Sequence, residues 1–355
     1  MQPQEWWLFA APVLVLALFL GLSMGKTLWE RRVPVTRGGD VRGVYAVSYA
    51  PDGRTLATAG YDKSIRLWNA QTQTPLLTLV AHRAVSSGLA FSPDGSYLAS
   101  ASWDGTVGLW NSQTGRCLIR LPGTGQRFKS VVFSPDGKTL AAGGSDALVR
   151  LWDVPGGALR RTFAASEKVG KDPRASVAFA PDGRTLAIGS NDGTIGLWNV
   201  GNGRLVRRLR SSSAGVIAIA FSPDGRVLAG GTWSNDIHLW DPRDGRRLST
   251  LFGPTGAVTC LAFSHDGQHL AAGSRDTQLR VWRCSSQVGK PWTLERTLSG
   301  HRGEVWALAF APDDRTLVSA SMDTTIKFWN LDVGTPGGPE GSTSNASTPT
   351  SAAPP

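Results

Sequence analysis

The chain has 355 residues, a formal net charge of +10 at pH 7 and a sequence pI near 10.0. Its three cysteines are odd in number and widely spaced, so they do not imply a disulfide framework. Neither the cysteines nor the histidines stand at the spacing of metal ligands, so we expect no metal site and no cofactor.

The first element along the chain is an apolar segment. Residues 1–5 form a short N-terminal tail, and residues 6–25 contain no charged side chain. About 20 apolar helical residues suffice to cross a bilayer core. Trp6 and Trp7 at the start of the segment and Trp29 after it suit the headgroup region. We expect a transmembrane helix over residues 6–25.

A cleaved signal peptide is the alternative for this segment, because Ser23 and Gly25 have the spacing of a cleavage site. A secretory signal begins with a positive region, however, and residues 1–5 hold no Lys or Arg. Positive side chains follow the segment instead, within a juxtamembrane linker over residues 26–31. The positive-inside rule then places the rest of the chain in the cytoplasm, as a single-pass membrane protein.

Most of the remaining chain is periodic. Tryptophans recur 42, 42, 46, 42, 42 and 47 residues apart, at Trp68, Trp110, Trp152, Trp198, Trp240, Trp282 and Trp329. Each lies sixteen residues after the Asp of a Pro-Asp-Gly type turn. Two turns are variants, His265-Asp266-Gly267 and Pro312-Asp313-Asp314. A fixed period of this length is the mark of a repeat architecture.

The repeats read as strands. Runs such as 130–133, 139–142 and 148–152 are short, apolar and rich in β-branched residues, and Pro, Gly, Asp and Ser clusters separate them. One unit is too small to bury both faces of its own sheet. The units are therefore expected to pack against one another around a centre.

The landmarks of the second repeat resemble those of the WD-repeat β-propeller family. They are Ala81-His82, then Phe91-Ser92-Pro93-Asp94-Gly95, then Trp103-Asp104-Gly105 and Leu109-Trp110-Asn111. Seven such copies cover residues 32–331. The resemblance implies an all-β fold, a seven-bladed β-propeller, here preceded by one transmembrane helix.

The resemblance also implies a stabilising tetrad of His, Ser, Asp and Trp. Two repeats carry it whole, as His82, Ser100, Asp104, Trp110 and as His301, Ser319, Asp323, Trp329. A catalytic set would not recur with the repeat, so we interpret these side chains as structural. The other repeats lack the His, and we expect their blades to rely more on packing.

The two ends of the repeat region predict how the ring closes. The segment Arg32-Val33-Pro34-Val35-Thr36 precedes the first repeat, and the last repeat lacks an outer strand. We expect this segment to complete the seventh blade, where Pro34 would suit an edge. Residues 332–355 are rich in Gly, Pro, Ser and Thr and are expected to be a disordered tail.

In this family one face of the disc commonly binds partners, and the residue before each turn Asp points there. In this sequence that row is Tyr61, Trp103, Ser145, Asn191, Trp233, Arg275 and Met322. A second row, on the inner strands, is Tyr45, Ser87, Lys129, Ala175, Ile217, Thr259 and Trp306. Aromatic, Met and Arg side chains are typical of interfaces. The partner-binding residues we predict are Tyr45, Tyr61, Trp103, Lys129, Trp233, Arg275, Trp306 and Met322.

Arginines gather on the expected outer strands, at 160–161, 204–210 and 246–247. Charged edge strands resist pairing with other sheets. Contact with anionic lipid is a second interpretation. Nucleic acid is the weakest, because no recognition motif marks this rim.

Together these features predict a non-enzymatic scaffold, a monomeric propeller that is anchored in a membrane and binds protein partners through one face. A propeller enzyme would need a non-repeating cluster of carboxylates, His or metal ligands around the channel, and the sequence offers none. A propeller that docks on anionic lipid or nucleic acid through its Arg rim stays open, and so does a propeller secreted after cleavage of a signal peptide.

Overall fold

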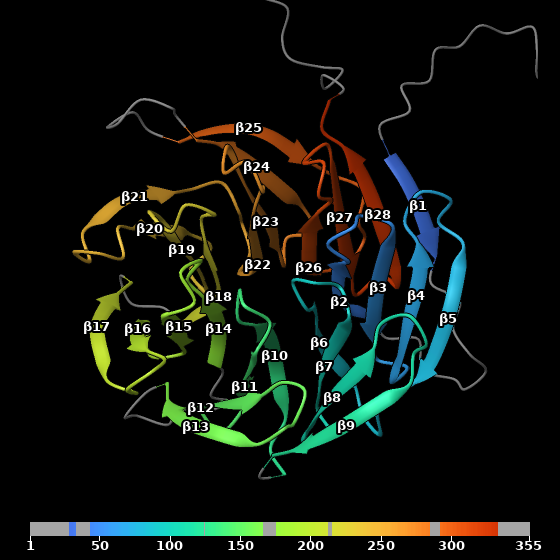
Figure 1. Ribbon diagram of the computed structural model, residues 1–355. Helices are drawn as coiled ribbons and strands as arrows, with labels where there is room; N and C mark the ends of the chain where they lie inside the picture. The colour runs from blue at the N-terminus through green and yellow to red at the C-terminus, as the bar shows by residue number, and fades with distance from the viewer. Residues whose placement is uncertain are drawn as a thin grey trace, which may run out of the picture.

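The computed structural model describes residues 28–32, 43–123, 125–165, 175–211, 215–284 and 292–332. Within these residues the chain forms seven antiparallel sheets of four strands each, arranged as blades around one centre (Figure 1). The predicted all-β propeller is therefore confirmed.

Blades 1 to 6 take their strands in chain order from the centre outwards, whereas blade 7 adds the first strand of the chain as its outermost strand. Blade 1 contains β2 (Val44–Tyr49), β3 (Thr55–Gly60), β4 (Ser64–Asn69) and β5 (Pro75–Val80). Blade 2 contains β6 (Ser86–Phe91), β7 (Tyr97–Ser102), β8 (Thr106–Asn111) and β9 (Cys117–Pro122). Blade 3 contains β10 (Phe128–Phe133), β11 (Thr139–Gly144), β12 (Leu148–Asp153) and β13 (Leu159–Ala164). Blade 4 contains β14 (Ala175–Phe179), β15 (Thr185–Ser190), β16 (Thr194–Asn199) and β17 (Leu205–Arg210).

The remaining blades follow the same order. Blade 5 contains β18 (Val216–Phe221), β19 (Leu228–Thr232), β20 (Ile237–Trp240) and β21 (Arg247–Leu251). Blade 6 contains β22 (Val258–Phe263), β23 (His269–Ser274), β24 (Leu279–Arg283) and β25 (Thr293–Leu298). Blade 7 contains β26 (Val305–Phe310), β27 (Thr316–Ser321), β28 (Thr325–Asn330) and, outermost, β1 (Leu28–Arg32).

The hydrophobic core is divided among the contacts between neighbouring blades. One cluster joins Ile65 and Leu67 of blade 1 to Phe91 and Leu98 of blade 2. All four side chains are at most 8% exposed, because each sheet buries its apolar face against the next. This explains why a single repeat of the sequence has no core of its own.

The ring closes when β1 pairs with β28, with Leu28 opposite Trp329 and Arg32 opposite Thr325. The blue β1 consequently lies beside the red-orange β28 in Figure 1. We expected this strand at residues 32–36, and that prediction was wrong in its position. The expectation assumed a short connection to the first inner strand, whereas residues 33–43 lie between β1 and β2. Connections between blades tolerate such differences in length.

Several predictions for the ends of the chain concern residues that the structure does not describe. The tail over residues 1–5, the segment 6–25, residues 33–36 and the tail beyond residue 332 lie outside the described residues. In the described part of the chain, no helix is long and apolar enough to cross a membrane. Residues 28–31, which we assigned to a linker, belong to β1.

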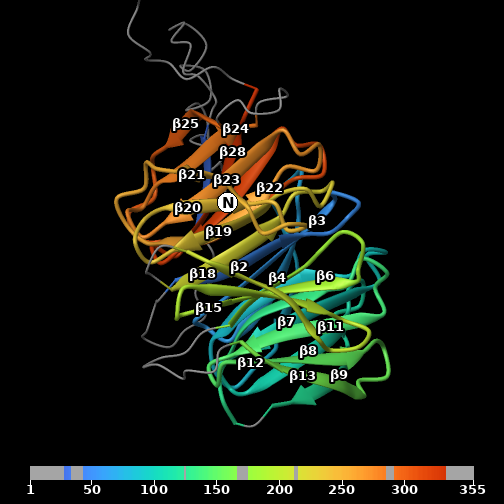
Figure 2. The same ribbon diagram turned by 90° about the vertical axis from the view of Figure 1, so that its left-hand side faces the viewer.

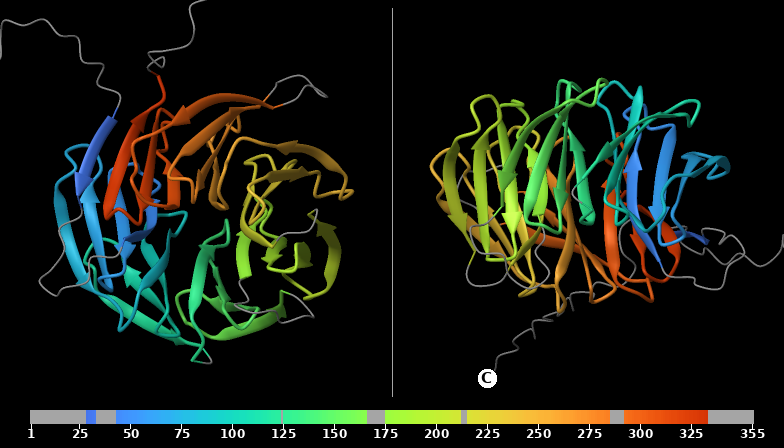
Figure 3. Two further views of the ribbon diagram at one scale, coloured as in Figure 1. Left: turned by 180° about the vertical axis from the view of Figure 1, so that it is seen from behind. Right: turned by 90° about the horizontal axis from the view of Figure 1, so that it is seen from below.

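The strands run between two faces of the disc, as Figure 2 and the right-hand panel of Figure 3 show. We call one the Pro-turn face, because it carries the Pro-Asp-Gly turns between first and second strands. The other is the Asp-turn face, which carries the turns between second and third strands, such as Tyr61-Asp62-Lys63, and the connections between blades. The same residue types recur at equivalent positions, so departures from the repeat stand out on each face.

Candidate functional site

A cavity of about 310 Å³ lies where the inner strands reach the Asp-turn face. It is lined by Tyr45, Ser87, Trp103, Lys129, Ser130, Ala175, Ser176, Ile217, Thr259 and Trp306. All seven residues of the predicted inner-strand row are in this lining. The N-terminal ends of the inner strands therefore converge on one site, because every blade presents the same strand end to the channel.

Three aromatic rings form one wall of this cavity. The centroid of Tyr45 lies 5.5 Å from that of Trp103 in an edge-to-face arrangement, and 5.7 Å from that of Trp306. The rings come from blades 1, 2 and 7. Tyr61, which we also predicted as a partner-binding residue, is not among the lining residues. Tyr61 lies in the turn after β3, where its backbone N–H donates to the Gly43 carbonyl.

The lining is polar as well as aromatic. Lys129 is the one charged side chain among the lining residues. The guanidinium of Arg127 lies 4.9 Å from the centroid of Trp103 and extends the aromatic wall outwards. Two buried polar atoms, Trp103 Nε1 and Ser176 Oγ, have no hydrogen-bond partner among the described residues. A bound polar group could relieve the desolvation cost of such atoms.

The other predicted partner-binding residues on the Asp-turn face lie outside the cavity. Trp233 Nε1 donates to Asn191 Oδ1 at 3.3 Å, and Arg275 lies over the Trp233 ring at 5.7 Å. Arg275 also pairs with Glu304 at 2.6 Å. Met322 lies beside Gly43, in the turn between β27 and β28. The eight predicted residues thus separate into a cavity group of four and a group of four outside the cavity, of which Trp233 and Arg275 contact neighbouring blades.

The two tetrads have the hydrogen-bonded order that the family resemblance implies. In blade 2, Trp110 Nε1 donates to Ser100 Oγ at 2.9 Å, His82 Nε2 lies 2.7 Å from Ser100 Oγ, and His82 Nδ1 lies 3.0 Å from Asp104 Oδ2. With the proton on Nδ1 of a neutral imidazole, every donor has an acceptor. Burial lowers the pKa of His82 despite the opposing charge of Asp104, so the neutral form is favoured.

Blade 7 repeats this network with nearly the same distances. Trp329 Nε1 donates to Ser319 Oγ at 2.8 Å, and His301 lies 2.7 Å from Ser319 Oγ and 2.8 Å from Asp323 Oδ2. Burial by itself would raise the pKa of Asp323, but hydrogen bonds from His301 and Thr325 outweigh it and keep the pKa low. The recurrence supports a structural function for both networks.

Blades without the tetrad histidine do not depend on packing alone, so that expectation was incomplete. In blades 1, 3 and 6 the turn Asp pairs with an Arg four residues later, on the third strand. The pairs are Asp62 with Arg66 at 2.6 Å, Asp146 with Arg150 at 2.6 Å and Asp276 with Arg280 at 2.8 Å. All three Arg side chains are 6–7% exposed. The signal was present in the sequence, as Asp and Arg at a spacing of four.

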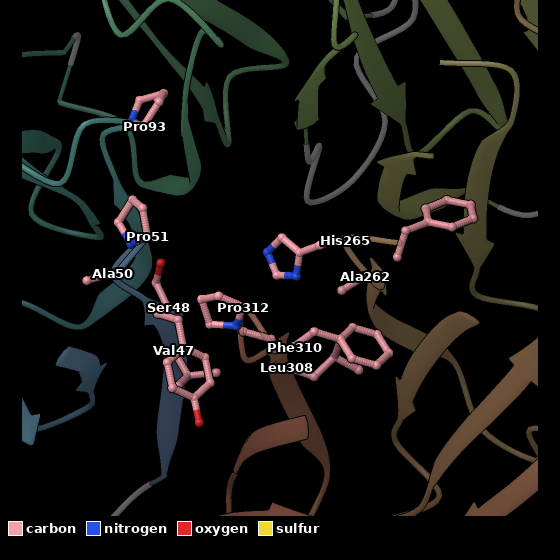
Figure 4. Close-up of a pocket in the computed structure, with 13 residues that line it drawn as sticks. Val47, Ser48, Ala50, Pro51, Pro93, Ala262, His265, Leu308, Phe310 and Pro312 are labelled. Atoms are coloured by element: carbon pink, nitrogen blue, oxygen red, sulfur yellow. The ribbon is translucent and has the colours of Figure 1, made fainter. Parts of the chain in front are cut away.

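The aromatic cavity on the Asp-turn face is one place where the residues depart from the repeat. The opposite mouth of the channel, on the Pro-turn face, is another. A cavity of about 460 Å³ is lined there by Pro51, Pro93 and Pro312 and by His265, which Figure 4 labels. Elsewhere each turn Gly faces the Pro of the preceding blade, as Gly95 faces Pro51.

At the junction of blades 6 and 7 both of these positions are changed. Asp314 stands at the Gly position, with φ +56°, and His265 stands at the Pro position. The Asp314 carboxylate accepts the backbone N–H groups of His265 and Asp266 and lies 2.8 Å from His265 Nδ1. Since proline has no N–H, His265 introduces a donor that Asp314 satisfies. The two variant turns in the sequence therefore contact each other, and each variant residue is explained by the other.

Part of the arginine rim has a structural function. Arg161 of β13 donates to the carbonyls of Gly201 and Asn202 in the next blade, and Arg207 of β17 donates to the carbonyl of Arg243 in the one after. Arg247 donates to the carbonyl of Arg210. These arginines connect neighbouring blades at the disc edge. Contact of the rim with anionic lipid stays a prediction.

The lining of the aromatic cavity is suited to binding a ligand. Among the described residues, no group of three or more His, Cys, Asp or Glu side chains could hold a metal ion. The non-repeating features at the two mouths are an aromatic and cationic cavity and a single His–Asp contact. The first of these has the volume and the mixture of apolar and polar lining that are typical of ligand sites.

Comparison with known proteins agrees with this architecture. A family model described as IFT122 first beta-propeller matches residues 43–243, and one described as WD domain, G-beta repeat, matches residues 245–283 and 292–330. A stretch of 47 residues is 43% identical to the Notchless protein homolog of Arabidopsis thaliana, covering 13% of this chain and 10% of that protein. The chain thus matches only about a tenth of that relative's length. The family matches, the tetrads and the seven blades together show that the chain belongs to the WD-repeat β-propeller family.

Proposed function

We propose that this protein is a non-enzymatic scaffold that binds a protein partner at the aromatic cavity of the Asp-turn face. The observation that carries the proposal is the convergence of Tyr45, Trp103, Lys129 and Trp306 on one cavity of about 310 Å³. Aromatic and cationic side chains, clustered as they are here, contribute most of the binding energy at protein interfaces. A repeat scaffold gives no structural reason for this local, non-repeating set.

Site-specific photocrosslinking in cells tests this proposal. A benzoylphenylalanine at Ile217, in the cavity lining, is expected to capture a discrete partner, whereas one at Val206, 61% exposed on β17, is expected to capture none. Trp103→Ala should abolish the capture, because it removes one side of the aromatic wall. Trp233→Ala is the matched control, since Trp233 lies on the same face outside the cavity. Capture that survives Trp103→Ala but is lost in Trp233→Ala would show that the partner binds around Trp233, outside the cavity.

We further propose that residues 6–25 anchor the propeller at the cytoplasmic side of a membrane. The support is the length and apolar character of this segment and the positive residues that follow it. Protease protection on vesicles of known sidedness, with N-terminal sequencing, tests this. An intact N-terminus and a cytoplasmically accessible propeller are expected. A chain that begins near Lys26, or a propeller on the outer side, would contradict the anchor in favour of a signal peptide.

A further inference from the structure

The distribution of charge around the aromatic cavity indicates what kind of partner it binds. Blades 7, 1, 2 and 3, which supply the aromatic wall and Lys129, also expose cations on the Asp-turn face. They are Lys63, Arg83, Arg127 and Arg302, with Lys129 in the cavity itself.

The carboxylates of the same sector are turned into the blades. The side chains of Asp104 and Asp323 are 9–10% exposed and accept hydrogen bonds from their tetrads, while those of Asp62 and Asp146 are 15–19% exposed and pair with Arg. Glu304 pairs with Arg275 at 2.6 Å. Because the anions are engaged within the protein and the cations face solvent, the sector presents a positive surface.

The cavity is suited to a single inserted side chain. Its volume of about 310 Å³ is at the lower end of the range for ligand pockets. Tyr45, Trp103 and Trp306 offer ring faces and edges to an aromatic or branched aliphatic group. Lys129 and the Arg127 guanidinium, which lies against Trp103, stand where carboxylates flanking that group would lie.

From this arrangement we propose that the partner contributes an acidic segment, in which one aromatic or aliphatic side chain enters the cavity and flanking carboxylates contact Lys129, Arg127 and Arg83. This rests on the proposed function and specifies its ligand. The carboxylates supply orientation and speed of association, and the apolar anchor supplies most of the affinity. Among the described residues around Trp233 and Asn191, the cation over the aromatic ring is Arg275, and it is already paired with Glu304.

A random twelve-residue peptide library selected on the full-length protein tests the inference. Wild-type protein is expected to enrich peptides with an aromatic or aliphatic residue among several Asp or Glu residues. A synthetic peptide of the enriched consensus should bind about tenfold more weakly to Lys129→Glu, as expected for the loss of one charge-assisted contact. Its affinity should also fall with added salt.

A matched pair of variants separates charge from folding. Arg127→Glu reverses a solvent-exposed charge and is expected to weaken the acidic consensus as Lys129→Glu does, whereas Lys129→Arg should preserve binding. Neutral or basic enriched peptides would overturn the acidic segment but leave partner binding at the cavity intact. If Trp103→Ala enriches the same peptides as wild type, the cavity itself is refuted. Tighter binding of a twelve-nucleotide RNA than of the consensus peptide would overturn the inference in favour of a nucleic acid.

Discussion

Blades 2 and 6 hold the same turn in two different ways. In blade 2 the partner of Asp104 is His82, which comes from the connection before the blade, and in blade 6 the partner of Asp276 is Arg280 on the third strand. Each carboxylate also accepts a backbone N–H from the connection that precedes its own blade. Asp104 accepts that of Arg83, and Asp276 accepts that of Thr255. The difference teaches that the turn carboxylate is the constant element, and that either a neutral or a charged partner can satisfy it.

The two solutions should differ in the cost of losing the carboxylate, because they leave different groups behind. Burial by itself would raise the pKa of both Asp104 and Asp276. For Asp104, hydrogen bonds from the Thr106 side chain and the Arg83 backbone outweigh the effect of burial. For Asp276, backbone hydrogen bonds from Thr255 and Gln278, together with the charge of Arg280, outweigh it. Both pKa values are consequently lowered. Removing Asp104 leaves an imidazole that can be neutral, whereas removing Asp276 leaves a guanidinium that cannot.

The largest expected effect is that of Asp276→Ala. The Arg280 side chain is 7% exposed and would become an unpaired buried charge, so we expect a loss of about 3–5 kcal/mol in the free energy of unfolding. Urea unfolding followed by tryptophan fluorescence measures it. The double variant Asp276→Ala with Arg280→Met should recover most of the loss, because it removes the orphaned charge. A single variant as stable as wild type would show that the pair does not hold the turn.

Asp104→Ala should cost less, about 1–3 kcal/mol, because the groups left behind are His82 and backbone N–H donors without an acceptor. Hydrogen exchange should show faster opening of β7 and β8, while blade 6 stays unchanged. Asp182→Ala, at an exposed Pro-Asp-Gly turn, is the control. Equal exchange in the variant and in wild type would remove the tetrad as a source of stability.

Blades 1 and 4 differ in whether the indole N–H of the repeat tryptophan has a hydrogen-bond acceptor, and we expect a smaller effect on stability from this difference. Trp68 Nε1 donates to Thr58 Oγ1 at 2.9 Å, whereas Trp198 Nε1 is buried without a partner among the described residues. Thr58→Val keeps the shape but removes the acceptor, so we expect a loss of about 1 kcal/mol. Ile188→Thr, at the equivalent position of blade 4, should destabilise by less than this, since its hydroxyl offers Trp198 Nε1 an acceptor. Thermal unfolding of both variants distinguishes these outcomes.

The smallest expected effect is that of mild acid on blade 2. Because the folded protein lowers the pKa of His82, the unfolded chain binds more protons, and stability from this residue rises with pH. The contribution is complete above the ordinary histidine pKa of about 6.5 and is lost as pH falls from there towards the folded value. It is small because the charge of Asp104 opposes burial. His82→Gln should reduce the stability difference between pH 7 and pH 5; an unchanged difference would contradict the assignment.

The repeat made most of the fold predictable. Seven tryptophans and seven turns in register with them require seven similar units, and the alternation of apolar runs with turn residues makes those units sheets. The inner-strand row was also predictable, because equivalent positions in a closed ring must converge. Prediction failed where the period is broken: the closing strand lies at Leu28–Arg32, since the length of a connection between blades is not fixed by the repeat.

Other features depended on contacts across the ring. The spacing of Asp276 and Arg280 was visible in the chain, but only the packed blade shows that the Arg replaces a histidine from a distant loop. The variant residues His265 and Asp314 are 49 positions apart, and neither alone predicts the other as its partner. Their pairing required the geometry of adjacent turns.

The sequence by itself determined the repeat and the number of blades, because both follow from a local pattern copied seven times. The family resemblance of that pattern implied the two histidine tetrads and the residues that face the channel. The tertiary structure decided which aromatic side chains meet, which arginines connect blades and which carboxylates are engaged within the blades. These depend on the contact of blades that are neighbours in the ring, including the first and the last. Only closure brings Tyr45, Trp103 and Trp306 together beside Lys129.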